Sequence, residues 1–100
     1  MEGRKFDAGK PQIGLIPSES IFAVARVMTY GAQKYAKNNW LHVPDAEQRY
    51  FDAALRHVLQ YNTGNKTDEE TGENHLAHAI CCLMFLLYAD ETGHAFPTKP

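Results

Sequence analysis

The stretch that decides the fold is Asp68–Ala89, DEETGENHLAHAICCLMFLLYA, in which acids and histidines lead directly into an apolar run. One face of the predicted helix is apolar at helical spacing, through Leu76, Ile80, Leu83 and Leu87. Its other sides are apolar too, through Cys82, Phe85 and Leu86. A helix that is apolar all round is buried on all sides, which a short chain does not achieve alone. The pattern therefore predicts a helix bundle that other subunits complete.

The N-terminal part of the chain predicts an irregular arm followed by a first helix. Residues 1–17 contain three glycines and two prolines, and we expect Ile13, Leu15 and Ile16 to anchor them to the core. Pro17-Ser18 resembles a helix entry, with Ser18 or Ser20 as the N-cap.

Two more helices follow. The second covers residues 45–62: Asp45 and Gln48 have capping-box spacing, and its core stripe is formed by Phe51, Leu55 and Val58. The third begins between Thr67 and Asn74, because several capping residues compete there. The predicted class is all-α: three main helices per chain in an oligomeric helical bundle, a dimer or a tetramer.

Length and charge limit the architecture and the partners. The 100 residues predict a single helical domain, with an arm at 1–17, a helical core at 18–94 and a tail at 95–100. The formal net charge of −2 argues against DNA binding, and the apolar run 77–89 is too short to span a membrane. The neighbouring Cys81 and Cys82 are typical of reduced core residues, which favours a cytoplasmic protein.

The histidines and acids of residues 68–78 predict a metal site. His75 and His78 stand three residues apart and share one face of a helix, and Asp68, Glu70 and Glu73 precede them closely. In the alternative reading, the acids complement the helix dipole and the histidines pack without a metal.

The second helix adds His57, which we expect to face this pair as a third nitrogen ligand. Asp52 and Arg56 precede it. They are either catalytic groups or members of a solvated ladder of ion pairs.

A loop between the first two helices predicts a nucleotide site. Lys34, Asn39 and Trp40 combine a cation, an amide and an aromatic ring, which suit a flat anionic ligand. In the alternative, Trp40 simply plugs the core. Lys10 of the arm is a further candidate for a phosphate contact, although the spacing of DAGKP excludes a P-loop.

Four segments together resemble a known family. KFDAGKPQIGLIP, YGAQKYAKNNW, RYFDAALRH and DEETGENHLAHAI, which span nearly the whole chain, are similar to the N-terminal domain of phage dATP/dGTP diphosphohydrolases, the MazZ-like enzymes. The wider relatives are the MazG-like all-α nucleotide pyrophosphohydrolases. Those enzymes carry E-x-x-E and E-x-x-D motifs, whereas the matching positions here hold Asp52 with Arg56 and His57, then His75 with His78.

The resemblance implies hydrolysis of dATP or dGTP to the monophosphate and pyrophosphate with a divalent metal, Mg²⁺ or Mn²⁺. Because imidazole ligands suit transition metals, another transition metal is an alternative. We expect the metal ligands to come from His57, Glu70, Glu73, His75 and His78, with catalytic roles for Asp52, Arg56 and Asp68 and nucleotide-binding roles for Lys10, Lys34, Asn39 and Trp40. The alternative is a non-catalytic, oligomeric phage protein that binds a nucleotide or a metal.

Overall fold

The chain is all-helical, as predicted. The computed structural model describes residues 1–99, and its three α-helices are α1 (Ser18–Lys34), α2 (Ala46–Asn62) and α3 (His75–Thr92). Two short 3₁₀ turns, Ile13–Leu15 and Asn39–His42, complete the regular structure. Within residues 1–99 no strand forms, apart from an isolated bridge between Thr67 and Asn74.

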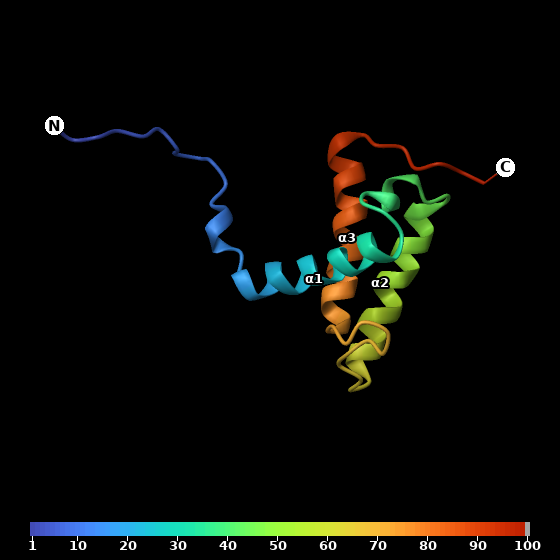
Figure 1. The fold of residues 1–100 in the computed structure, drawn as a ribbon. Helices are drawn as coiled ribbons and strands as arrows, with labels where there is room; N and C mark the ends of the chain where they lie inside the picture. The colour runs from blue at the N-terminus through green and yellow to red at the C-terminus, as the bar shows by residue number, and fades with distance from the viewer. Residues whose placement is uncertain (100) are drawn as a thin grey trace.

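Helices α2 and α3 form an antiparallel pair, and α1 crosses α3 (Figure 1). Val24 and Val27 of α1 are buried against Ala77 and Cys81 of α3. Small residues at these α3 positions let the two helices approach closely, because their side chains fill little of the space between the helix axes. The first two turns of α3 are thereby held between α1 and α2.

The start of α3 is set by the loop before it. The backbone N–H of His75 donates to the carbonyl of Lys66 at 2.8 Å, and that of Asp68 donates to the carbonyl of Glu73, also at 2.8 Å. The Asn74 side chain then accepts a hydrogen bond from the N–H of Leu76 at 2.8 Å. Asn74 is therefore the N-cap of α3, at the far end of the range that the sequence left open.

Replacing Asn74 by alanine is expected to lower the free energy of unfolding by about 1 kcal/mol, because the N–H of Leu76 loses its acceptor. Urea denaturation followed by circular dichroism measures the change. Asn74→Asp keeps an acceptor oxygen and serves as the control, with a value close to wild type. A loss in the aspartate variant equal to that in the alanine variant would contradict the capping role.

The predicted N-cap of α1 is wrong, whereas Asp45 is the N-cap residue of α2 as predicted but without the capping hydrogen bond. The N-cap of α1 is Pro17, which has no side-chain donor or acceptor, and Ser18 is already helical. Asp45 precedes α2 in a left-handed conformation (φ 54°) and caps no N–H with its side chain. The Gln48 amide instead donates to Asp52 one turn further along, at 2.9 Å.

Several residues expected in the core are exposed in this single chain. Ile13, Leu15 and Ile16 of the arm, with relative exposures of 70%, 78% and 53%, do not anchor it. The expected stripes of α2 and α3 are also partly exposed: Phe51, Leu55, Val58, Leu76, Ile80, Leu83 and Leu87. Helical spacing identifies which residues share a face, but not whether the same chain covers that face.

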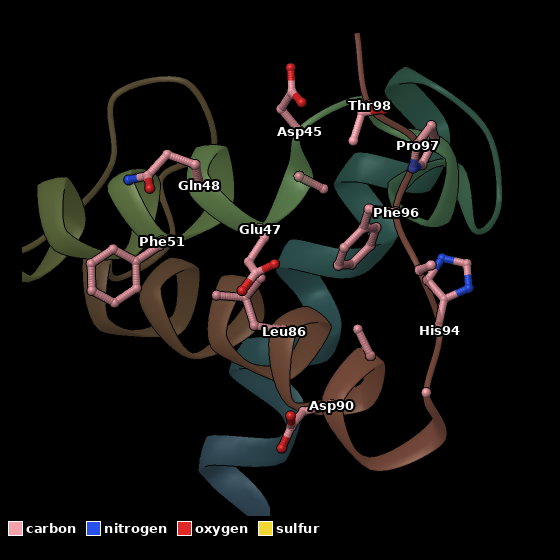
Figure 2. Close-up of a pocket in the computed structure, with 14 residues that line it drawn as sticks. Asp45, Glu47, Gln48, Phe51, Leu86, Asp90, His94, Phe96, Pro97 and Thr98 are labelled. Atoms are coloured by element: carbon pink, nitrogen blue, oxygen red, sulfur yellow. The ribbon is translucent and has the colours of Figure 1, made fainter.

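The C-terminal tail packs on its own chain. The Asp45 N–H donates to the Pro97 carbonyl at 2.8 Å, and His94 Nε2 lies 3.0 Å from the Leu41 carbonyl oxygen. Between this tail, the start of α2 and the end of α3 lies an open cleft of about 980 Å³, with Phe51 and Phe96 on its walls (Figure 2).

The same tail helps to hold the loop before α2. The Trp40 ring stacks on Phe85 of α3, with centroids 4.4 Å apart, and meets Tyr88 and Phe96 edge-on.

A search of the described helices for a membrane-spanning segment finds none with the required length and hydropathy.

Candidate functional site

Three imidazoles meet where α2 faces the first turn of α3. His57 Nδ1 lies 2.8 Å from His75 Nδ1, and the His57 ring stacks on His78 with centroids 4.6 Å apart. His75 and His78 share a face because they are three residues apart on α3. The packing of α2 against α3 supplies the third ring, so the expected convergence of these three histidines is present in the structure.

Asp68 is held beside the imidazoles by the loop between α2 and α3. Its Oδ2 accepts hydrogen bonds from the backbone N–H groups of Glu70 (3.1 Å) and Thr71 (3.0 Å). Gly72 has φ +72°, a left-handed conformation that favours glycine and turns the chain back toward Asn74. This turn directs the Asp68 side chain toward α2 and α3.

Thr71 links Asp68 to His78. The Thr71 hydroxyl lies 3.2 Å from Asp68 Oδ2 and 2.7 Å from His78 Nε2. A hydroxyl donates only one proton, and an ionised carboxylate only accepts. Thr71 therefore donates to Asp68 and accepts from the Nε2–H of His78, an assignment that leaves His78 Nδ1 as a free acceptor.

The site favours the neutral form of His57 and His78 next to an ionised carboxylate. Burial, together with the neighbouring His78 and His75, lowers the pKa of His57 from 6.5 to about 4. Burial also lowers the pKa of His78. Burial acts to raise the pKa of Asp68, but the hydrogen bonds from Thr71 and the nearby His78 outweigh it, so the net shift is downward.

His75 has an unsatisfied nitrogen. Its side chain is 5% exposed, and its Nε2 is buried without a hydrogen-bond partner. Because its Nδ1 is already paired with His57, Nε2 is either a bare acceptor or an N–H with no acceptor. A buried polar atom of this kind costs free energy unless something binds to it.

His57, Asp68 and His75 form a donor set for a metal ion. One ligand atom from each residue lies within 4.8 Å of the other two. Neutral imidazoles and an ionised carboxylate are the protonation states that a metal requires. The buried nitrogen of His75 has no partner within the chain, and Asp68 is already oriented by its hydrogen bonds. Both features suit residues that hold a metal, so this donor set fits a divalent ion.

The two glutamates that we expected as ligands are placed differently. Glu70 is paired with Lys34 (3.1 Å), and Glu73 is paired with Arg26 (3.0 Å). Both ion pairs tie the loop to α1, and neither glutamate belongs to the close donor set.

The candidate nucleotide residues of the loop line a common cavity of about 240 Å³ between α1, the Asn39–His42 turn and α3. Lys34, Asn39 and Trp40 contribute to its wall, as do Thr71 and His78 of the cluster. The cavity therefore borders the histidine cluster at Thr71 and His78. Its remaining surface is largely apolar and aromatic, through Val27, Met28, Tyr30, Tyr35, Tyr50 and Phe85.

The remaining predicted residues lie elsewhere. Asp52 and Arg56 line a neighbouring surface depression of about 640 Å³, which shares Asn39 with the nucleotide cavity, and Asp52 accepts a hydrogen bond from Gln48. Lys10 is on the exposed arm and lines none of these cavities.

Sequence reasoning overlooked Thr71 and Arg26 as members of the site. The spacing of Asp68 and Thr71, an acid three residues before a threonine, is typical of a side-chain-capped turn and was the available signal for Thr71. Nothing in the local pattern pairs Arg26 with Glu73, which follows it by 47 residues.

The fold and the histidine cluster together define the class of protein. It is an α-helical chain in which histidines and a carboxylate, as possible metal ligands, lie next to an aromatic cavity. The family described as dATP/dGTP diphosphohydrolase, N-terminal, matches residues 1–98, and the chain belongs to that family. The resemblance inferred from the four segments is thereby confirmed.

A dATP/dGTP diphosphohydrolase of Salmonella phage PMBT28 is 43% identical over 88 residues, which are 88% of this chain and 30% of the relative. The chain thus spans less than a third of the relative's length. No solved structure matches it.

Proposed function

We propose that this protein hydrolyses dATP or dGTP to the nucleoside monophosphate and pyrophosphate with a divalent metal. The observation that carries the proposal is the donor set of His57, Asp68 and His75, which opens beside a cavity of nucleoside size. The name of the phage relative and the family description support the same reaction and the same purine substrates.

His57, Asp68 and His75 would hold the metal in this proposal. Two imidazoles and one carboxylate favour Mn²⁺ or another transition metal, because Mg²⁺ prefers a shell made only of oxygens. When bound, such a metal polarises a phosphoryl oxygen and lowers the pKa of water. Thr71 positions Asp68 and His78 through its hydroxyl group, and the free Nδ1 of His78 is an additional nitrogen donor at the edge of the cluster.

The cavity would hold the nucleoside. Trp40 is covered on one face by Phe85, so only its other face is available to a base. Asn39 supplies a side-chain amide that donates and accepts hydrogen bonds. Lys34 lies at the junction between the cavity and the acidic loop, where it is suited to contact a phosphate.

The reaction is tested with the purified protein and each of the four deoxynucleoside triphosphates in the presence of Mg²⁺, Mn²⁺ or Co²⁺. Phosphorus NMR is expected to show pyrophosphate and dGMP or dAMP, with the highest rate in Mn²⁺ or Co²⁺. Release of orthophosphate, or no reaction with any of the four substrates, would reject this reaction.

A second candidate is a non-catalytic, oligomeric nucleotide- or metal-binding protein. The observation that favours it is the position of two expected catalytic groups, because Asp52 and Arg56 line a neighbouring depression rather than the cavity beside the donor set. Calorimetry that detects tight dGTP binding, under conditions where NMR detects no pyrophosphate with any metal, would support this candidate over the enzyme.

Replacing Thr71 by valine is expected to weaken Mn²⁺ binding by about 10- to 100-fold, because Asp68 and His78 lose the hydroxyl that orients them. Valine keeps the size of the side chain, so the helical circular dichroism signal should stay near wild type. Electron paramagnetic resonance of free Mn²⁺ measures the affinity. Thr71→Ser, which retains the hydroxyl, is the control, and equal affinities of the valine and serine variants would contradict the role.

A further inference from the structure

The chain exposes more surface than a compact chain of its size. Its accessible surface is 7893 Å², whereas a folded monomer of 11.3 kDa exposes about 5,700 Å². Its radius of gyration is 16.7 Å, against about 13 Å for a compact domain of 100 residues. The excess of about 2,000 Å² is larger than the share that each partner buries in a standard protein–protein interface.

Two apolar surfaces contribute to this excess. The first is the N-terminal arm, residues 1–17, which runs away from the helices and exposes Phe6, Ile13, Leu15 and Ile16 (Figure 1). The second is the stripe of α3 that consists of Leu76, Ile80, Leu83 and Leu87. These positions are on a different side of α3 from Ala77 and Cys81, which contact α1.

The two surfaces are complementary in charge as well. The arm carries Arg4, Lys5 and Lys10 against Glu2 and Asp7, which gives a formal charge of +1 (three minus two). The loop before α3, residues 63–74, carries four acids, Asp68, Glu69, Glu70 and Glu73, against one basic residue, Lys66. Opposite charges at adjoining surfaces favour association and fix its orientation.

Two of the cations nearest to the site are already paired with acids of the loop before α3. Within residues 1–99, Lys34 at the cavity is paired with Glu70, and Arg26 is paired with Glu73. Stabilising the charge that develops on a transferring phosphoryl group requires cations that are directed at it. Under the proposed function, a further cation directed at the phosphate would therefore add to the positive charge of the site.

We propose that the arm of one copy crosses to a second copy of this chain, packs on the α3 stripe and brings Lys10 to the second copy's phosphate site. This inference rests on the proposed function for the role of Lys10, but not for the exchange of the arm. Lys10 precedes Ile13 by three residues, a span of about 10 Å when extended. Leu76 directly follows His75, so Ile13 seated at this end of the stripe places Lys10 within reach of the histidine cluster.

Subunit complementation tests the role of Lys10. Lys10→Glu and His75→Ala, each weakly active or inactive alone, are co-expressed with different tags and purified through both tags. If the arm is exchanged, one site of each mixed dimer has both an intact Lys10 and an intact His75, and turnover returns to about half of wild type. If each arm serves its own site, the mixture stays at the level of the Lys10→Glu variant, which overturns the inference.

Isotope-resolved cross-linking tests the exchange without using activity. A photo-reactive phenylalanine analogue replaces Phe6, and ¹⁴N and ¹⁵N copies are mixed. Peptides that join a ¹⁴N arm to a ¹⁵N α3 are expected. Cross-links that are confined to one isotope, or a sedimentation mass equal to one chain, overturn the exchange. A wild-type protein with no hydrolytic activity would reject the proposed function, and the cross-links would still decide whether the arm is exchanged.

Discussion

Replacing His75 by alanine is expected to reduce Mn²⁺ affinity by at least about a hundredfold and to abolish pyrophosphate release. His75 supplies one of the three close donor atoms, and its Nδ1 pairs with His57 at 2.8 Å. Its removal takes one nitrogen from the donor set and frees the other imidazole to rotate. Metal content after dialysis measures the first effect, and phosphorus NMR measures the second.

A histidine outside the cluster provides the matched control. His42 is exposed in the turn before α2, so His42→Ala should bind the metal and hydrolyse dGTP as wild type does. His57→Ala is a second test that does not alter the first turn of α3, and it should lose affinity as His75→Ala does. If His75→Ala or His57→Ala binds Mn²⁺ as tightly as wild type and as His42→Ala, the donor set is not a metal site.

The convergence of the imidazoles was predictable from spacing. His75 and His78 are three residues apart on a helix, and His57 lies on the helix that is expected to face them. The choice of carboxylate was not predictable. Asp68 points at the imidazoles because the loop reverses at Gly72 and pairs Thr67 with Asn74, and both features depend on contacts that no periodic pattern records.

The helices themselves were predicted more accurately than their environment. Apolar spacing located α2 within one residue, at Ala46–Asn62 against the expected 45–62, since a helix of this length imposes its own period. The same spacing assigned Ile80 and Leu83 of α3 to a core, although both side chains are partly exposed in one chain. An apolar pattern shows that a surface is suited to burial. It does not distinguish burial within the same chain from burial against a second copy.

Trp40→Ala is expected to be the most destabilising of these substitutions, by about 3 kcal/mol or more. The indole fills the space between the turn before α2 and the side of α3, where it contacts Phe85, Tyr88 and Phe96. Removing it leaves a void that these rings fill only in part. Because folded domains are stable by about 5–15 kcal/mol, this loss is a large fraction of the total.

Urea denaturation followed by circular dichroism measures that loss, since Trp40 is the single tryptophan and its fluorescence disappears with it. Trp40→Phe keeps an aromatic ring against Phe85 and should retain most of the stability, which makes it the variant for testing the nucleotide site. Under the proposed function we expect it to raise the KM for dGTP while changing kcat little, because a base stacked on the indole would be held equally in the ground state and the transition state. An unchanged KM would assign Trp40 to the core alone, and an alanine variant within about 1 kcal/mol of wild type would contradict the core role as well.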